Sequence, residues 1–305
     1  MLSVVLRSWK AYFVLMVGFM AGDVLQYRQR ALLAVVDELS ARGRSSKFMI
    51  EKNLFLLKKE ESLDSDIKFY NFFPYRYGPF SNMSYFDLNG LRLKGYLSGD
   101  EKNPGITEKA KGVIASLNPG VKRKIAKTAE RFKSDNEIKD YVYDKYPEYT
   151  VKSESSKIKR TPCPPGIFTI GYEGRDIDAF LDTLIKNSIE VLVDVRWNPF
   201  SMNLSFTQKK LSGYLQKVGI AYKHVPELGI DGELRKNVET PEDYKKLFEV
   251  YKETLKERKK ELEEIASFGA RNRIALMCFE HDRDMCHRGV IADYLGLRNI
   301  QVGHL

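Results

Sequence analysis

Between residues 167 and 302 the chain alternates short apolar runs with amphipathic segments, which constrains the fold more than any other feature. The run Glu190-Val-Leu-Val-Asp-Val195 is almost continuously apolar, as in a strand buried on both faces. Further strands are predicted over 167–170, 221–225, 273–278 and 299–302, and helices over 177–187, 207–218, 243–268 and 289–295. Strands that alternate with helices indicate a parallel sheet. The sequence therefore predicts an α/β domain with a Rossmann-like parallel sheet and helices on both faces.

A separate, mainly helical domain is predicted before this pattern. Helices are expected over 24–39, from Ser45 or Ser46 to Leu57, over 81–94 and over 107–117, with an extended aromatic segment at 69–80 and a small hairpin or wing at 95–105. This order of elements is typical of a winged-helix variant. The proline-containing stretch 152–165 has no apolar periodicity and indicates a linker. The predicted parts are an apolar extension at 1–23, a helical winged-helix-like domain at 24–150, a linker at 151–166 and a Rossmann-like domain at 167–305.

Charge is distributed unevenly along the chain. Residues 1–166 contain 29 Lys+Arg against 19 Asp+Glu, and the remainder contains 21 against 22. A basic half attracts nucleic acid, an anionic protein or a membrane surface, although solubility alone also accounts for the excess. Three cysteines cannot form an even disulfide framework, so the reducing cytoplasm is the expected compartment.

The first 22 residues resemble a secretory signal or a short anchor, because two basic residues precede an apolar run at 11–21. This run is shorter than the roughly 20 residues needed to span a bilayer, so no stable membrane insertion is expected. Three interpretations remain open. Translation starts at Met16 or Met20 and the segment is an upstream extension, which we prefer; the segment is a genuine signal or anchor; or it is a packed helix.

Polar or flexible residues follow four of the predicted strands. Because ligands of open parallel sheets bind beyond the carboxyl ends of the strands, these stretches predict one site. Candidate ligand-binding residues are Gly171, Glu173, Gly174, Arg175, Arg196, Asn198, Ser201, His224, Glu227, Cys278, His287 and Arg288. Candidate catalytic residues are Tyr172, Asp194, Glu280 and Cys286. The alternatives are that Asp194 and Arg196 form an ion pair, that Tyr172 belongs to the core and that Cys278 is a small buried hydrophobe.

The densest group of reactive side chains lies between Cys278 and Arg288. Cys286 is expected near the start of the last helix, where the helix dipole and basic neighbours favour a thiolate. Arg288 is interpreted as an anion clamp at the same helix start. Zinc is disfavoured, because adjacent Cys286 and His287 are not expected to reach one ion. We therefore predict no metal and no cofactor.

Four motifs in the C-terminal half occur in the order of a known family. They read Thr169-Ile-Gly-Tyr-Glu-Gly174, Val193-Asp-Val-Arg196 with Asn198-Pro199 and Ser201, Pro226-Glu-Leu-Gly229, and Cys278-x-Glu280 with Cys286-His-Arg288. Together they resemble the domain-of-unknown-function 488 family over about residues 166–305, which implies a Rossmann-like fold with a polar pocket and brings no established reaction. In the N-terminal half, Lys52-Asn-Leu-Phe-Leu-Leu57 and Tyr77-Gly78-Pro79 resemble the Panacea-type antitoxin domain over about residues 25–117.

Three functions are compatible with these patterns. The preferred one is an enzyme that acts on a phosphate-containing nucleotide or on nucleic acid. In this enzyme Arg196 and Arg288 hold phosphate, and Glu280, Asp194 or Tyr172 provides acid or base catalysis. The second is a non-catalytic regulator in a toxin-antitoxin or defence system, which binds nucleic acid or a protein through the N-terminal domain and senses a ligand through the α/β domain. The third is a rhodanese-like sulfurtransferase or a phosphatase, although nine residues between Cys278 and Arg288 exceed the tight loop that such chemistry requires.

Overall fold

The computed structural model describes residues 24–154, 163–235 and 238–305. The expected N-terminal extension lies outside these residues, as does much of the expected linker. The chain divides into two compact units. Among the described residues, the helical unit comprises those up to Tyr70 together with Ser84–Ile138, and the α/β unit comprises Asn71–Met83 and those from Lys139 to Leu305. The boundary within 151–166 stays a prediction. In the part of the chain that the structure describes, no helix combines the length and apolarity needed to cross a bilayer.

The helical unit is built around buried apolar faces of short helices, as the periodicity predicts. Ser46 caps α3 by accepting a hydrogen bond from the Met49 amide over 3.0 Å, which selects it over Ser45. A two-stranded antiparallel sheet, β3–β4, lies in the segment expected to form a wing. The elements are α2 Tyr27–Ser40, α3 Lys47–Lys59, α4 Leu63–Asp66, α5 Asn82–Leu93, β3 Leu97–Gly99, β4 Pro104–Ile106, α6 Glu108–Ala115 and α7 Pro119–Glu130. Helix α8 Asp135–Lys145 begins in this unit and ends in residues assigned to the α/β unit. The winged-helix and Panacea-type resemblances stay predictions.

The α/β unit contains the predicted parallel sheet. Its five strands have the order β7-β6-β8-β5-β9, and every neighbouring pair is parallel. The strands are β5 Gly166–Gly171, β6 Val191–Asp194, β7 Ala221–His224, β8 Arg273–Cys278 and β9 Val302–His304. The expectation for the last strand was wrong by three residues. After α13 the backbone turns through the left-handed region at Asn299, with φ of 61°, and pairing with β5 begins only at Val302.

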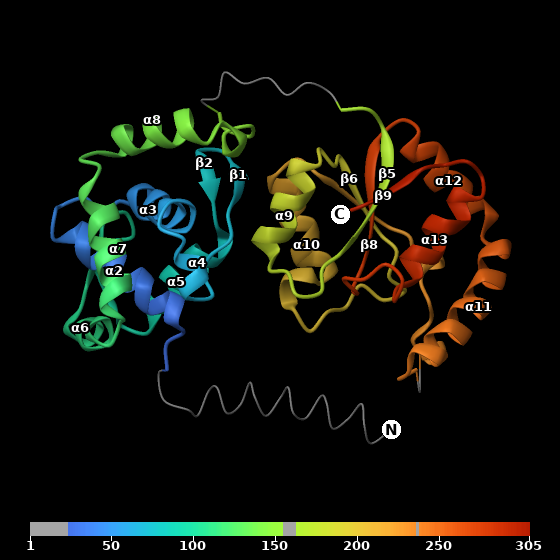
Figure 1. Cartoon of the computed structure of the whole chain (residues 1–305), viewed down its shortest axis with the longest axis horizontal. Coiled ribbons are helices and arrows are strands. Elements are labelled where there is room, and N and C mark those ends of the chain that lie inside the picture. The colour runs from blue at the N-terminus through green and yellow to red at the C-terminus, as the bar shows by residue number, and fades with distance from the viewer. Residues whose placement is uncertain (1–23, 155–162, 236–237) are drawn as a thin grey trace. The chain divides into compact units, whose positions relative to one another are not determined.

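Helices cover both faces of the sheet, which confirms the predicted architecture (Figure 1). On one face α9 Ile177–Lys186 and α10 Gln208–Lys217 pack against Leu192 and Met277. The other face carries α11 Pro241–Glu257, α12 Lys259–Gly269 and α13 His287–Gly296.

The single helix expected over 243–268 is instead two helices, which meet at Arg258. The break falls in a polar stretch between two apolar ones. Leu247, Tyr251 and Leu255 recur every four residues, polar residues follow, and the apolar pattern resumes only at Leu262. Both apolar stretches pack on this face of the sheet, and the non-helical backbone at Arg258, with φ of -95° and ψ of 34°, lies between them.

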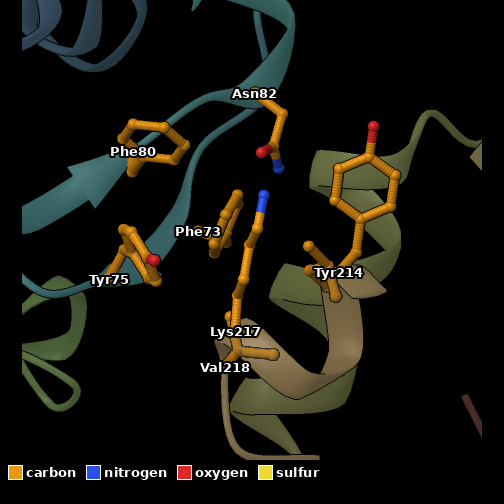
Figure 2. Close-up of a pocket in the computed structure, with 8 residues that line it drawn as sticks. Phe73, Tyr75, Phe80, Asn82, Tyr214, Lys217 and Val218 are labelled. Atoms are coloured by element: carbon orange, nitrogen blue, oxygen red, sulfur yellow. The ribbon is translucent and has the colours of Figure 1, made fainter. Parts of the chain in front are cut away.

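A hairpin from the first half of the sequence belongs to the α/β unit. Strands β1 Phe73–Tyr75 and β2 Gly78–Phe80 pair antiparallel, and Gly78 supplies the positive φ of 86° that the turn requires. Figure 2 shows the hairpin's aromatic side chains facing α10 across a small pocket, with Lys217 extending toward Asn82. The sequence predicted the extended segment and its turn, but not this packing partner.

A buried carboxylate ties the end of this hairpin to α9. Asp178 is fully buried and accepts hydrogen bonds from the Ser81 hydroxyl at 2.8 Å, from the Asn82 amide at 3.1 Å and side chain at 2.8 Å, and from the Met83 amide at 3.0 Å. Burial outweighs these donors and raises the pKa of Asp178 to about 6. The folded protein therefore holds this proton more tightly than the unfolded chain does.

Replacing Asp178 with asparagine is expected to lower the free energy of unfolding at pH 7 by about 1–3 kcal/mol, because an amide nitrogen cannot accept from the hairpin donors. The stability difference between wild type and Asp178→Asn should fall as the pH rises from about 4 to about 6, since the raised pKa favours folding only while the carboxyl is protonated. Denaturant titrations across this pH range measure both effects. Asp182→Asn, one turn further along α9, is the control, and an equal loss there would contradict the assignment.

Candidate functional site

The end of β6 carries a buried ion pair rather than a free acid. Asp194 is completely buried and Arg196 is 5% exposed. The guanidinium donates to both carboxylate oxygens, Nε to Oδ1 at 2.8 Å and Nη2 to Oδ2 at 2.6 Å, while the Tyr222 hydroxyl donates to Oδ2 at 2.6 Å. Burial alone would lower the pKa of Arg196, but Asp194 raises it above its ordinary value. These contacts favour the ion-pair alternative, so both groups stabilise this end of the strand.

Tyr172 belongs to the same network. Its ring stacks on Phe206 with centroids 4.3 Å apart, and its hydroxyl accepts a hydrogen bond from Arg196 Nη1 at 3.1 Å. The ring is 4% exposed, which agrees with the core alternative.

The glycine-containing stretch after β5 supports the loop that follows β8. A Cβ at Gly171 would lie 1.9 Å from the Glu280 carbonyl oxygen, so only glycine permits this approach. The amides of Tyr172 and Glu173 donate to the carbonyls of Cys278 and Phe279, and the Glu173 carboxylate accepts from the His281 amide at 2.9 Å. The close approach expected here is therefore made to another backbone segment.

Other predicted binding residues have local partners. Arg175 donates to Thr183 and to the Leu305 carbonyl. Asn198 and Ser201 accept from backbone amides two residues further on, and His224 Nε2 lies 2.8 Å from the Arg196 carbonyl oxygen. Gly174 has a φ of 72° in its turn, and Glu227 is exposed on the short helix Pro226–Leu228. None of these contacts brings a side chain to the β8 loop.

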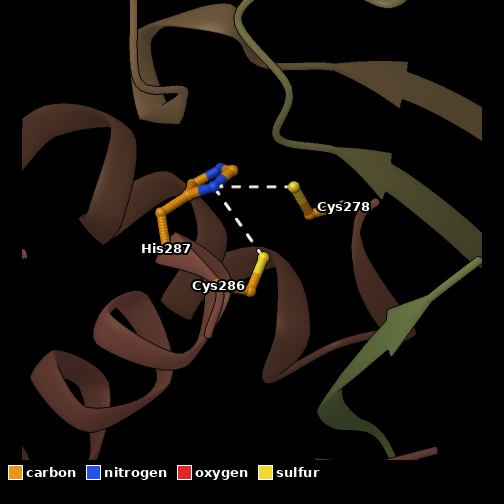
Figure 3. Close-up of side chains that lie close together, drawn as sticks. All are labelled: Cys278, Cys286 and His287. Atoms are coloured by element: carbon orange, nitrogen blue, oxygen red, sulfur yellow. Dashed lines mark hydrogen bonds between the residues drawn. The ribbon is translucent and has the colours of Figure 1, made fainter. Parts of the chain in front are cut away.

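Three predicted residues do converge at that loop. The Cys278 and Cys286 Sγ atoms lie 3.5 Å and 3.9 Å from His287 Nδ1, and the three donor atoms all lie within 4.8 Å of one another. Figure 3 shows how the three side chains come together. All three residues are buried. Adjacent Cys286 and His287 thus place their donor atoms close enough to face one ion, contrary to the expectation from the sequence. Cys286 is the N-cap of α13 and His287 its first residue, so the backbone bends sharply between them.

Two hydrogen bonds define the tautomer of His287. Its Nε2 lies 2.9 Å from the Val195 carbonyl oxygen, which only accepts, so Nε2 carries the proton. Arg235 Nη2 donates to Nδ1 over 3.1 Å, and a guanidinium cannot accept. Nδ1 therefore carries the lone pair of the ring, and the sulfur atoms of both cysteines lie within 4 Å of it.

A partly exposed ion pair borders these three residues. Glu280 Oε2 lies 3.3 Å from Cys278 Sγ, and Glu280 Oε1 accepts from Arg235 Nη1 at 3.3 Å. Burial raises the pKa of Glu280, but the Cys286 thiol and Arg235 together hold it below its ordinary value. Arg235 was not predicted, because its segment has no apolar periodicity. Arg235 follows β7 in the sequence, and the other candidate residues also follow strands of the sheet. This shared position would have identified it.

Two chemical expectations for this loop were wrong. Burial, followed by the neighbouring Cys278, raises the pKa of Cys286 well above its ordinary value, and this outweighs His287. The Arg288 side chain is 2% exposed and donates to the carbonyls of Glu280 and His281 at 2.5 and 2.7 Å. Arg288 therefore holds the loop in shape, and the anion loop expected of a rhodanese or a cysteine phosphatase is not formed around it.

Fold and site together define a parallel α/β domain with a thiol, imidazole and carboxylate cluster at the carboxyl ends of its strands. Residues 176–295 match the family model described as domain of unknown function DUF488, which confirms the predicted resemblance over this part of the α/β unit. The match begins just after the Thr169–Gly174 motif. No curated protein and no solved structure matches the chain.

Proposed function

We propose that the α/β unit is a hydrolytic enzyme acting on a phosphate-containing nucleotide or on nucleic acid, with its chemistry at Glu280. The observation that carries this proposal is the position of the Glu280 carboxylate. It is 15% exposed, held by Arg235, and 3.3 Å from Cys278 at the sheet edge where ligands of such folds bind. Glu280 accepts the proton of the attacking water as the water oxygen bonds to the substrate, and then returns that proton to the leaving group.

The surroundings support a substrate that has phosphate and an aromatic base. Arg235 has a 36% exposed side chain, and it replaces the buried Arg196 and Arg288 in the proposed phosphate contact. Trp197 and Phe279 follow the paired strands β6 and β8 and are 46% and 45% exposed. Exposed aromatic rings stack on nucleobases. The basic N-terminal half would attract the same anionic substrate.

The proposal predicts that Glu280→Gln lowers turnover by about 10²–10⁴-fold while the Kd for substrate changes little, because the amide keeps the shape but cannot accept a proton. Full-length protein would be incubated with ribonucleoside monophosphates and triphosphates and with a single-stranded oligonucleotide. Products would be identified by mass spectrometry. Glu227→Gln is the matched control, since Glu227 is an exposed carboxylate at the same sheet edge. Full turnover in Glu280→Gln, or an equal loss in both variants, would refute the role.

A further inference from the structure

The geometry points to a zinc site formed by Cys278, Cys286 and His287, with three protein ligands and a fourth position beside Glu280. Zinc bonds of about 2.3 Å to sulfur and about 2.0–2.1 Å to nitrogen, at tetrahedral angles, place sulfur and nitrogen about 3.6 Å apart. The observed separations from His287 Nδ1 are 3.5 Å to Cys278 Sγ and 3.9 Å to Cys286 Sγ. Both sulfur-to-nitrogen separations are therefore within a few tenths of an ångström of the distance that a tetrahedral ion requires.

The second contact of His287 favours a metal ligand. Zinc-binding histidines commonly donate their other ring N–H to a carbonyl or carboxylate, which orients the ring and leaves the opposite lone pair for the metal. His287 has this arrangement through the Val195 carbonyl. Metal binding replaces the hydrogen bond from Arg235 to Nδ1, and Arg235 retains Glu280 as its partner.

The charges balance when zinc is bound. Two thiolates neutralise the divalent cation, and Arg235 neutralises Glu280, so the three buried ligands with their ion and the partly exposed ion pair beside them carry no net charge. Binding releases the two thiol protons to solvent. Softer divalent ions with the same preference for sulfur fit the same donors, whereas calcium and magnesium prefer oxygen ligands.

The number of ligands matches a catalytic site better than a structural one. Structural zinc sites have four protein ligands, whereas catalytic sites have three and a water. Glu280 is outside the group of donors that lie within 4.8 Å of one another, but it is adjacent to Cys278. A water on the fourth position would be the one that Glu280 deprotonates. This role of the water rests on the proposed function, whereas metal binding itself does not.

The experiment measures metal in the full-length protein. After expression with added zinc and gel filtration, elemental analysis should give about one zinc per chain. Cys278→Ser and Cys286→Ser should each lose it, and Cys163→Ser should retain it, because Cys163 is an exposed cysteine outside the site. Zinc retained in the double variant Cys278→Ser/Cys286→Ser would overturn the proposal.

A second measurement covers the case in which the cysteine variants do not fold. Wild-type protein freed of metal by a chelator would be titrated with cobalt(II), and a thiolate-to-cobalt charge-transfer absorption is expected. The absence of this band, or a Cys278–Cys286 disulfide in the isolated protein, would overturn the site. Zinc binding without hydrolysis of any substrate would refute the proposed function alone. Hydrolysis that persists in a protein without zinc, and that needs Glu280, would refute the zinc site alone.

Discussion

Asp194→Ala is expected to lower the free energy of unfolding by about 3–5 kcal/mol, because it leaves the Arg196 guanidinium buried without its carboxylate. The Tyr222 hydroxyl loses its acceptor at the same time. Denaturant titrations followed by circular dichroism would measure the change.

Two further variants separate the charge from the hydrogen bond. Tyr222→Phe removes only one donor to Asp194 and should cost about 1 kcal/mol. The double variant Asp194→Leu/Arg196→Met removes both charges and should be less destabilised than Asp194→Ala alone. If Asp194→Ala and Tyr222→Phe cost the same, the ion pair does not stabilise the strand end as described.

Gly171→Ala should cost at least about 3 kcal/mol, and it should also disturb the β8 loop. The new Cβ would be 1.9 Å from the Glu280 carbonyl oxygen and 2.7 Å from its carbon. Both neighbours are backbone atoms, so no side-chain rotation relieves the clash. The loop must move, and Glu280 moves with it. Thermal unfolding measures the first effect, and zinc content of the folded fraction measures the second.

Gly213→Ala is the control for this substitution. Gly213 lies inside α10, and no atom comes within 4 Å of the added Cβ. Alanine there should stabilise the helix by about 0.5–1 kcal/mol, because glycine costs more backbone entropy. Equal behaviour of the two variants would show that the contact between Gly171 and Glu280 is not tight.

Hydropathy predicted most of the fold. A strand buried on both faces gives a continuous apolar run in the sequence, and an amphipathic helix gives apolar residues at helical spacing. The hydropathy pattern predicted four of the strands, and it predicted that their carboxyl ends lie at one edge of the sheet. The break at Arg258 and the late start of β9 were not predicted, because they depend on how two elements fit against the sheet. The packing of β1–β2 was also missed, since Asn82 and Asp178 are 96 positions apart in the sequence and no local pattern joins them.

The site was predicted as a region, but not as a set of contacts. Position relative to the strand ends identified the segments of Cys278, Glu280 and His287. Whether Arg288 points to a ligand or to its own loop depends on side-chain conformation, and no spacing rule determines it. The pKa of Cys286 was misjudged for a related reason. The helix dipole follows from sequence position, whereas complete burial depends on the finished fold.

The hairpin β1–β2 makes the α/β unit discontinuous in sequence, and this affects how the protein can be synthesised and rearranged. During synthesis the hairpin leaves the ribosome well before α9. Its aromatic side chains therefore cannot pack on α9 until the rest of the helical unit has been made. A gene fragment that begins after residue 154 encodes the DUF488 match without the donors that Asp178 requires. Transfer of this domain to another gene as one contiguous fragment would therefore omit the hairpin.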